Sequence, residues 1–166
     1  MKTIYLLIGP KGSGKSYIGT LIQEQIGIPF LRVEDWAKAV KKDRTINNEH
    51  YIKDVFEAIE QGVRSALMQK DKVVFESTGL SDAFDLMLKN LRRDFKVITI
   101  GVKADPKTCL QRVKSRDQSI HIAVSDDQVL EINRMVVEKG MKTDYVVQNG
   151  IDHAKTPLEQ LVFMVG

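Results

Sequence analysis

Residues 9–16 combine the residue types that bind phosphate at the spacing that phosphate binding requires. They read Gly-Pro-Lys-Gly-Ser-Gly-Lys-Ser, which is a glycine, four residues and then Gly-Lys-Ser. Glycines let the main chain curl so that successive N–H groups point at one anion. The lysine brings a mobile positive charge, and the final hydroxyl can ligate Mg²⁺. This stretch therefore predicts a phosphate cradle.

The neighbouring sequence places the cradle between a strand and a helix. Residues 4–8 are an apolar run typical of a buried strand, and Ile18, Ile22 and Ile26 recur at helical spacing after the cradle. This is the context of a P-loop, in which the helix N-terminus adds its dipole and unpaired N–H donors. We therefore expect ATP and Mg²⁺ to bind here; the alternative is a glycine-rich turn that binds nothing.

Individual roles follow from the motif. Lys15 is expected to reach the β- and γ-phosphates as a catalytic group, and Ser16 to ligate the metal. The residues expected to contact the nucleotide are Gly9, Lys11, Gly12, Ser13, Gly14, Lys15, Ser16 and Tyr17, together with Arg112.

Acidic residues follow two further apolar runs. Glu34 and Asp35 come after residues 28–33, and Glu76 ends residues 72–76. Ligands of parallel sheets bind beyond the carboxyl ends of the strands. Glu34 is therefore expected to orient an acceptor hydroxyl or metal-bound water, although capping of the next helix by Asp35 is an equal alternative. Glu76 is expected to hold the Mg²⁺ water shell or act as a base; the alternative is a surface glutamate at a strand end.

Two arginines, Arg112 and Arg116, lie four residues apart on a predicted helix that begins at Asp105-Pro106. A short link follows, and a capping box at Ser125 begins the next helix. Residues 112–126 therefore resemble a lid that closes over phosphates, with the arginines stabilising charge and Arg116 catalytic. The alternative is that both arginines only interact with the dipole of their helix C-terminus.

The elements that must position these residues alternate between strand and helix. Five strands are expected, the last two at residues 96–102 and 144–147, and the alternation predicts an α/β fold with a five-stranded parallel sheet. The helical region at about residues 35–70 is long for a crossover connection. It either builds a pocket beside the phosphate site or merely covers the sheet.

Length and composition limit the classes of protein to which this chain can belong. The 166 residues are expected to form one domain, residues 1–166, because 43% hydrophobic content suffices for one core. The net charge is +3 without a dense basic block, so nucleic acid is not expected as the main partner. The single cysteine, Cys109, and the lack of an apolar run that could span a membrane favour a cytoplasmic protein. It is expected to be a monomer or a homodimer.

The chain resembles the P-loop small-molecule kinases, the group around shikimate kinase, gluconate kinase and zeta-toxin-like kinases. The resemblance implies a three-layer P-loop NTPase fold of the nucleoside and shikimate kinase type, ATP with Mg²⁺, a substrate-binding helical region and an arginine-bearing lid. It places Glu34 where shikimate kinases have the second aspartate of an Asp-x-Asp pair, and Arg116 in the lid. The implied reaction moves the γ-phosphate of ATP to a hydroxyl of a small-molecule acceptor.

The sequence departs from the shikimate kinase pattern around the acceptor. Arg32 stands where the first aspartate is expected, Lys53 replaces a substrate-binding arginine, and Phe56 takes the place of a glutamate. Ile120 also stands where a lid arginine is expected. The nucleotide-binding machinery therefore carries over from the family, whereas shikimate is not expected to be the best acceptor.

Two other functions compete with phosphotransfer. Residues 76–79 and 102–105 faintly resemble the Asp-x-x-Gly and Asn-Lys-x-Asp motifs of a GTPase switch, but their separation leaves room for only one helix and one strand. A non-catalytic nucleotide-binding regulatory protein is the third interpretation.

Overall fold

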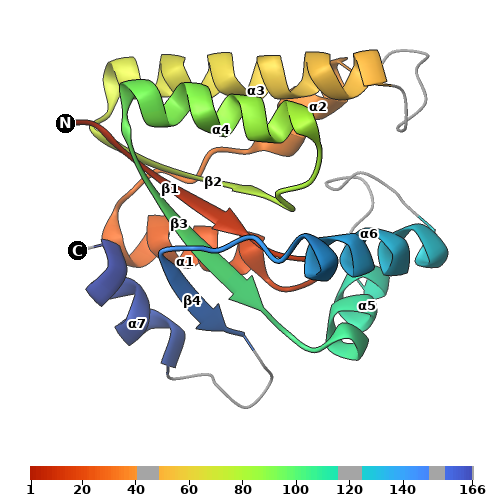
Figure 1. The fold of residues 1–166 in the computed structure, drawn as a ribbon. Coiled ribbons are helices and arrows are strands. Elements are labelled where there is room, and N and C mark those ends of the chain that lie inside the picture. Colours follow the sequence, from red (N-terminus) through yellow and green to blue (C-terminus); the bar gives the residue numbers. More distant parts are fainter. Residues whose placement is uncertain (41–48, 116–124, 150–155, 166) are drawn as a thin grey trace.

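A parallel β-sheet between two layers of helices forms the architecture (Figure 1). The computed structural model describes residues 1–40, 49–115, 125–149 and 156–165. The strands there are β1 (Thr3–Ile8), β2 (Lys72–Ser77), β3 (Lys96–Lys103) and β4 (Tyr145–Gln148). The helices there are α1 (Lys15–Ile26), α2 (Val33–Val40), α3 (Glu49–Gln69), α4 (Asp82–Asp94), α5 (Pro106–Ser115), α6 (Asp126–Lys139) and α7 (Thr156–Val165). The expected α/β class is confirmed.

The strand order is β2-β1-β3-β4, and each neighbouring pair is parallel. β1 lies between two strands and is buried along its whole length, which explains its continuous apolar run. Alternate residues serve opposite faces: Leu6 packs in the cluster that includes α3 and α4, and Leu7 in the cluster that includes α1 and α7. Figure 1 shows these two pairs of helices on opposite sides of the sheet.

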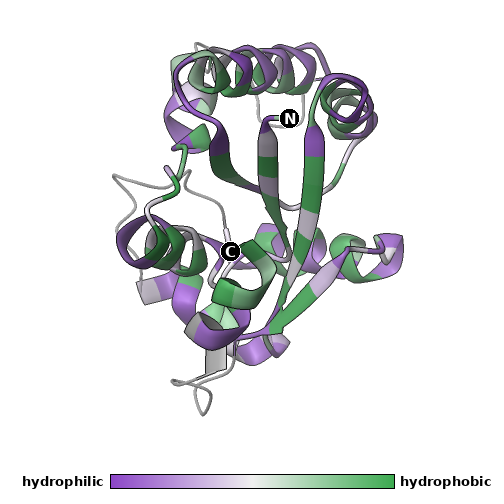
Figure 2. Cartoon of the chain, turned by 90° about the vertical axis from the view of Figure 1, so that its left-hand side faces the viewer, coloured by the Kyte–Doolittle hydropathy of each residue, from purple (hydrophilic) through white to green (hydrophobic). Residues whose placement is uncertain are grey.

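The helices that cover the sheet, α1, α3, α4 and α7, turn apolar residues toward the strands. In α3 the buried residues recur every fourth position, namely Tyr51, Val55, Ile59, Val63 and Leu67. Figure 2 shows the same division, with mostly hydrophobic central strands and helices that carry hydrophilic stretches. Within the described ranges, we find no helix with both the length and the apolar character needed to cross a membrane.

The prediction of five strands is wrong, because residues 28–33 do not form a strand. Their contact with the sheet is one isolated bridge between Phe30 and Val74, made by Leu31 N–H to Val74 O and Val74 N–H to Pro29 O. Pro29 lacks an N–H group, and the Phe30 N–H is donated to the side chain of Gln23 instead. The chain then turns into α2 at Val33, so the sheet has four strands.

The predicted capping box at the start of α6 is confirmed, and three other helix ends also carry local capping residues. The Ser81 side chain accepts from the N–H of Phe84 at the start of α4, and Ser125 forms the predicted capping box of α6 with Gln128. Gly27 and Gly140 end α1 and α6 in the left-handed conformation. These signals are local, so the sequence alone was enough to predict them.

Candidate active site

The phosphate cradle lies between the end of β1 and the first turn of α1. Gly12 and Gly14 adopt φ angles of 80° and 96°, which favour glycine. A Cβ atom on Gly12 would lie 2.1 Å from the main-chain oxygen of Cys109. One on Gly14 would lie 1.9 Å from Nδ2 of Asn149. Both glycines are therefore required by close packing as well as by the turn.

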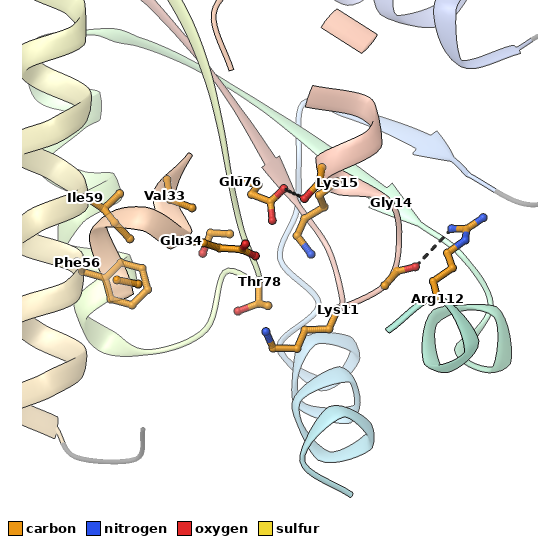
Figure 3. Close-up of a pocket in the computed structure, with 14 residues that line it drawn as sticks. Lys11, Gly14, Lys15, Val33, Glu34, Phe56, Ile59, Glu76, Thr78 and Arg112 are labelled. Atoms are coloured by element: carbon orange, nitrogen blue, oxygen red, sulfur yellow. Dashed lines mark hydrogen bonds between the residues drawn. The ribbon is translucent and has the colours of Figure 1, made fainter. Parts of the chain in front are cut away.

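Lys15, the first residue of α1, is buried beside the cradle. Its Nζ donates hydrogen bonds of 2.8 Å to the main-chain oxygens of Gly9 and Pro10. Those oxygens keep a buried ammonium group partnered within the loop. The loop therefore positions the lysine beside the space that phosphate oxygens would enter (Figure 3).

Ser16 and Glu76 meet at the same end of the sheet. Glu76 lies one residue before the end of β2, and its Oε2 accepts a hydrogen bond of 2.8 Å from Oγ of Ser16. Glu76 pairs with Leu7 in the β1–β2 register, so the sheet itself brings the carboxylate beside the P-loop. A hydroxyl and a carboxylate are hard oxygen donors suited to Mg²⁺.

A cavity of about 300 Å³ opens in front of these groups (Figure 3). Residues of the P-loop, of β2 and of the segment just after it line one part, whereas α2 and α3 line the other. The lining residues from α2 and α3 are Val33, Glu34, Ala37, Phe56 and Ile59. The cavity thus has a polar end formed around the P-loop and a separate, largely apolar wall formed by α2 and α3.

Glu34 lines this cavity, although it does not end a strand as expected. It lies in the first turn of α2, and Asp35 beside it is exposed. The helix begins at Val33, so Asp35 does not take the N-cap position either. Of the two acids, Glu34 is the one that reaches the site.

Arg112 donates hydrogen bonds to the main chain of the cradle and of the segment after β4. Its Nη1 donates to the main-chain oxygens of Gly12 and Ser13 at 3.4 and 3.2 Å, and Nη2 donates to Asn149 O at 3.0 Å. Asn149 completes the arrangement by donating from Nδ2 to Ser13 O at 3.0 Å. Arg112 also lines the cavity, so it lies next to the expected phosphate position.

The other predicted site residues fall into three groups. Lys11, Gly12 and Gly14 line the cavity with Lys15 and Ser16. Gly9, Ser13 and Tyr17 belong to the loop or α1 but are not part of the lining, and the Tyr17 side chain is exposed. Arg116 and Ile120 lie outside the described residues, as does most of the predicted lid at 112–126. The described ends of that segment meet where Lys114 pairs with Asp126 at 3.0 Å.

Cys109 is buried and packs behind the cradle. Burial raises the pKa of its thiol, while the nearby charges of Arg112 and Lys15 act in the opposite direction. A buried, protonated thiol is a poor nucleophile, which agrees with a structural role.

Asn133 of α6 is a site residue that the sequence did not reveal. Its Oδ1 accepts from the Lys11 N–H at 2.7 Å, and its Nδ2 donates to the Lys11 main-chain oxygen at 3.0 Å. The sequence shows only a polar residue one turn after Val129, on a helix with an apolar stripe. The partner lies 122 residues away, so only the tertiary structure shows the contact.

Comparisons with known proteins agree with this geometry. A family model described as AAA domain matches residues 4–139. A curated shikimate kinase from Bartonella quintana (strain Toulouse) is 30% identical over 113 residues, which cover 68% of this chain and 53% of that protein. The match thus spans about half the length of that relative.

Solved structures show the same fold at low sequence identity. A sugar kinase from Janibacter sp. HTCC2649 has a TM-score of 0.70 at 11% identity, and the match covers 99% of this chain and 94% of that one. A shikimate kinase from Acinetobacter baumannii, in complex with shikimate, has a TM-score of 0.62 at 18% identity, with coverage of 98% and 91%. The resemblance to the fold of P-loop small-molecule kinases is therefore confirmed.

Proposed function

This chain belongs to the AAA domain family and has the fold of P-loop small-molecule kinases, and on that premise we propose that it transfers the γ-phosphate of ATP to a hydroxyl of a small molecule. One observation supports the proposal above the others. A single cavity is lined at one end by the P-loop and Glu76, and at the other by α2 and α3. Donor phosphate and acceptor can therefore occupy one space, as a direct transfer requires.

The chain's own groups are suited to positioning and charge stabilisation. Lys15 would exchange its main-chain partners for phosphate oxygens, and the N–H groups of the cradle would bind the same anion. Ser16 and Glu76 would hold Mg²⁺, which when bound neutralises negative charge on the phosphates. Glu34, across the cavity, would accept a hydrogen bond from the acceptor hydroxyl and so orient it.

A GTPase switch has less support from the local geometry. Asp105, the aspartate of the segment that resembles a guanine-reading motif, caps α5 instead. Its Oδ1 accepts from the N–H groups of Lys107 and Thr108, and the Thr108 hydroxyl donates to Oδ2. These hydrogen bonds, that of the Thr108 side chain above all, lower the pKa of Asp105. We therefore propose ATP as the nucleotide.

The test incubates the protein with γ-labelled ATP or GTP, Mg²⁺ and a pool of hydroxylated metabolites, and identifies phosphorylated products by mass spectrometry. We expect label transfer from ATP to an alcohol. Lys15→Ala should abolish transfer and weaken ATP binding in calorimetry, whereas Lys89→Ala, an exposed lysine on α4, should do neither. Binding without transfer would favour a regulatory protein, and a preference for GTP would favour a switch; either result contradicts the proposal.

A further inference from the structure

The wall of the cavity that faces the P-loop indicates which acceptors fit. We propose that the acceptor is a hydroxyl compound with an apolar body and no negative charge. This inference rests on the proposed phosphotransfer and concerns the same cavity. It depends on the wall formed by α2 and α3, here called the acceptor wall and made of Val33, Glu34, Ala37, Phe56 and Ile59.

Four of the five side chains in the acceptor wall are apolar. Val33, Ala37 and Ile59 are buried, and Phe56 is half-buried. The Phe56 ring meets Phe84 edge to face, with ring centroids 6.1 Å apart and planes at 72°, so its position is supported from α4. Figure 3 shows Phe56, Ile59 and Val33 together on the side opposite Arg112. Such a surface favours an apolar ring or chain, whose burial removes apolar area from water.

The positive charges of the cavity come from elements other than the acceptor wall, although Figure 3 shows the Lys11 side chain extending toward Thr78. Among the described lining residues the cations are Lys11, Lys15 and Arg112, which come from the P-loop and α5. These are the groups that phosphate would require. The acceptor wall carries one charged residue, and that residue is the acid Glu34.

Two further cations, Lys53 and Arg32, lie close to the cavity in the fold but do not line it. Lys53 lies on α3, pairs with Glu57 at 3.9 Å, and lines a separate groove between α3 and α4. Arg32 is exposed and lines a smaller adjoining cavity of about 150 Å³, next to Glu34 and Glu76. Neither residue lines the main cavity. The smaller cavity that Arg32 lines also includes Val33 and Glu34 of the acceptor wall.

A carboxylate placed against the acceptor wall would therefore be desolvated by side chains that supply no cation of their own, and the described cations of the cavity come from the P-loop and α5. Burial of an unpaired charge is strongly unfavourable. A hydroxyl meets no such penalty, because it can donate to Glu34 or exchange hydrogen bonds with Thr78, which also lines the cavity. The wall thus selects against negative charge and for an apolar body.

The experiment compares matched pairs that differ only in charge. Shikimate and its methyl ester share three hydroxyls, and 4-(hydroxymethyl)benzoate and its methyl ester form an aromatic pair. Binding is followed by the fluorescence of Trp36, the single tryptophan, which lies in α2 next to Ala37. Transfer of phosphate from ATP is followed separately by mass spectrometry. In at least one pair we expect the ester to bind about tenfold more tightly than the acid, or better.

Binding and transfer can fail independently. Tighter binding of the acids, equal binding within each pair, or no binding by any ester would overturn the proposed acceptor class, even if ATP phosphorylates some other alcohol. Selective binding of an ester without phosphate transfer to any compound would support the ligand class of the cavity and would instead contradict the proposed function.

Two variants test the acceptor wall directly. Phe56→Arg places a cation in the wall, and Thr78→Lys adds one from the segment after β2 that lines the same cavity, without removing a core side chain. Both should reduce the ester preference about tenfold or reverse it, since selectivity is a difference between two affinities. Lys53→Ala, one turn away on α3 but outside the cavity, should leave the preference within about twofold.

Circular dichroism of each variant shows whether it folds, and Thr78→Lys keeps the test valid if Phe56→Arg does not. An unchanged ester preference in folded Thr78→Lys would overturn the argument from charge.

Discussion

Ser16 Oγ donates a hydrogen bond of 2.8 Å to Glu76 Oε2, and this bond joins the first turn of α1 to the end of β2. The two residues are 60 positions apart in the sequence. One belongs to the P-loop and the other to the neighbouring strand, so the sheet register creates their contact. The pair marks the position where we propose that Mg²⁺ binds.

We expect Glu76→Gln to lower turnover by a factor on the order of a hundred, because the amide offers one neutral oxygen where a carboxylate held the metal or accepted a proton. Ser16→Ala should raise the Mg²⁺ concentration needed for half-maximal turnover. In the double variant the losses should be less than multiplicative, since both residues act on one ion. Steady-state kinetics over a Mg²⁺ series provides the measurement.

Glu24→Gln, an exposed glutamate on α1, is the matched control and should behave as wild type. Near-normal turnover of Glu76→Gln, or fully multiplicative losses in the double variant, would contradict a shared metal role.

Asn133 is expected to position the P-loop from α6. Asn133→Leu keeps the size of the side chain but leaves the N–H and C=O of Lys11 without these partners, at a cost of about 1–3 kcal/mol. A distorted cradle should raise the KM for ATP about tenfold and change kcat less. Asn133→Asp should be intermediate, because it can still accept from the N–H but has no donor for the carbonyl.

Asn90→Leu is the control for Asn133. Asn90 lies on α4 and donates to Glu60 of α3 at 3.0 Å, away from the cradle. Its loss should lower stability without a change in the KM for ATP. If both leucine variants raise this KM equally, Asn133 affects only general stability.

Gly62 allows α2 to pack against α3. A Cβ atom at this position would lie 2.5 Å from Cζ2 of Trp36, so alanine forces the indole to move. Alanine improves helix propensity by about 1 kcal/mol, whereas overpacking costs about 1–3 kcal/mol. We expect Gly62→Ala to lower the free energy of unfolding by about 1 kcal/mol and to alter Trp36 emission. Urea denaturation followed by fluorescence measures both effects.

Ser65→Ala, an exposed position on the same helix, isolates the effect of propensity and should be neutral or slightly stabilising. A Gly62→Ala protein more stable than wild type would show that Trp36 relaxes without cost.

Asp94 should make part of the free energy of unfolding depend on pH under acidic conditions. Hydrogen bonds from Arg93, and then from Arg64 of α3, lower its pKa from 3.8 to about 2. The folded state therefore binds fewer protons than the unfolded state between these values. The contribution of Asp94 is complete above about pH 4 and is lost as the pH falls toward 2.

Urea midpoints measured from pH 7 down to pH 2 test this expectation. The difference between wild type and Asp94→Asn should be constant above pH 4 and should shrink below it. Ser65→Ala, an exposed position without a titratable group, serves as a control, and its difference from wild type should stay constant down to pH 2. A difference that stays constant down to pH 2 would exclude Asp94 as the titrating group.

The strand predicted at residues 28–33 shows where the local sequence pattern is insufficient to predict secondary structure. Its apolar residues satisfy a strand pattern, yet Ile28 packs in one core cluster and Val33 begins a helix that packs in the other. A proline without an N–H and a glutamine that captures the Phe30 N–H limit pairing to one bridge. Whether this segment joins the sheet as a strand depends on its hydrogen-bonding partners, which the spacing of apolar residues does not specify.

The sequence by itself determined the phosphate cradle, because a P-loop needs a fixed spacing of glycine, lysine and hydroxyl between a strand and a helix, and all of these are local. It also indicated that Glu76 lies at the end of a buried strand. Only the tertiary structure decided that Ser16 donates a hydrogen bond to Glu76 and that Asn133 hydrogen-bonds to the main chain of Lys11. It also decided that Phe56 and Ile59 line the same cavity as the P-loop. Those contacts depend on sheet register and helix packing, which join residues from distant parts of the chain.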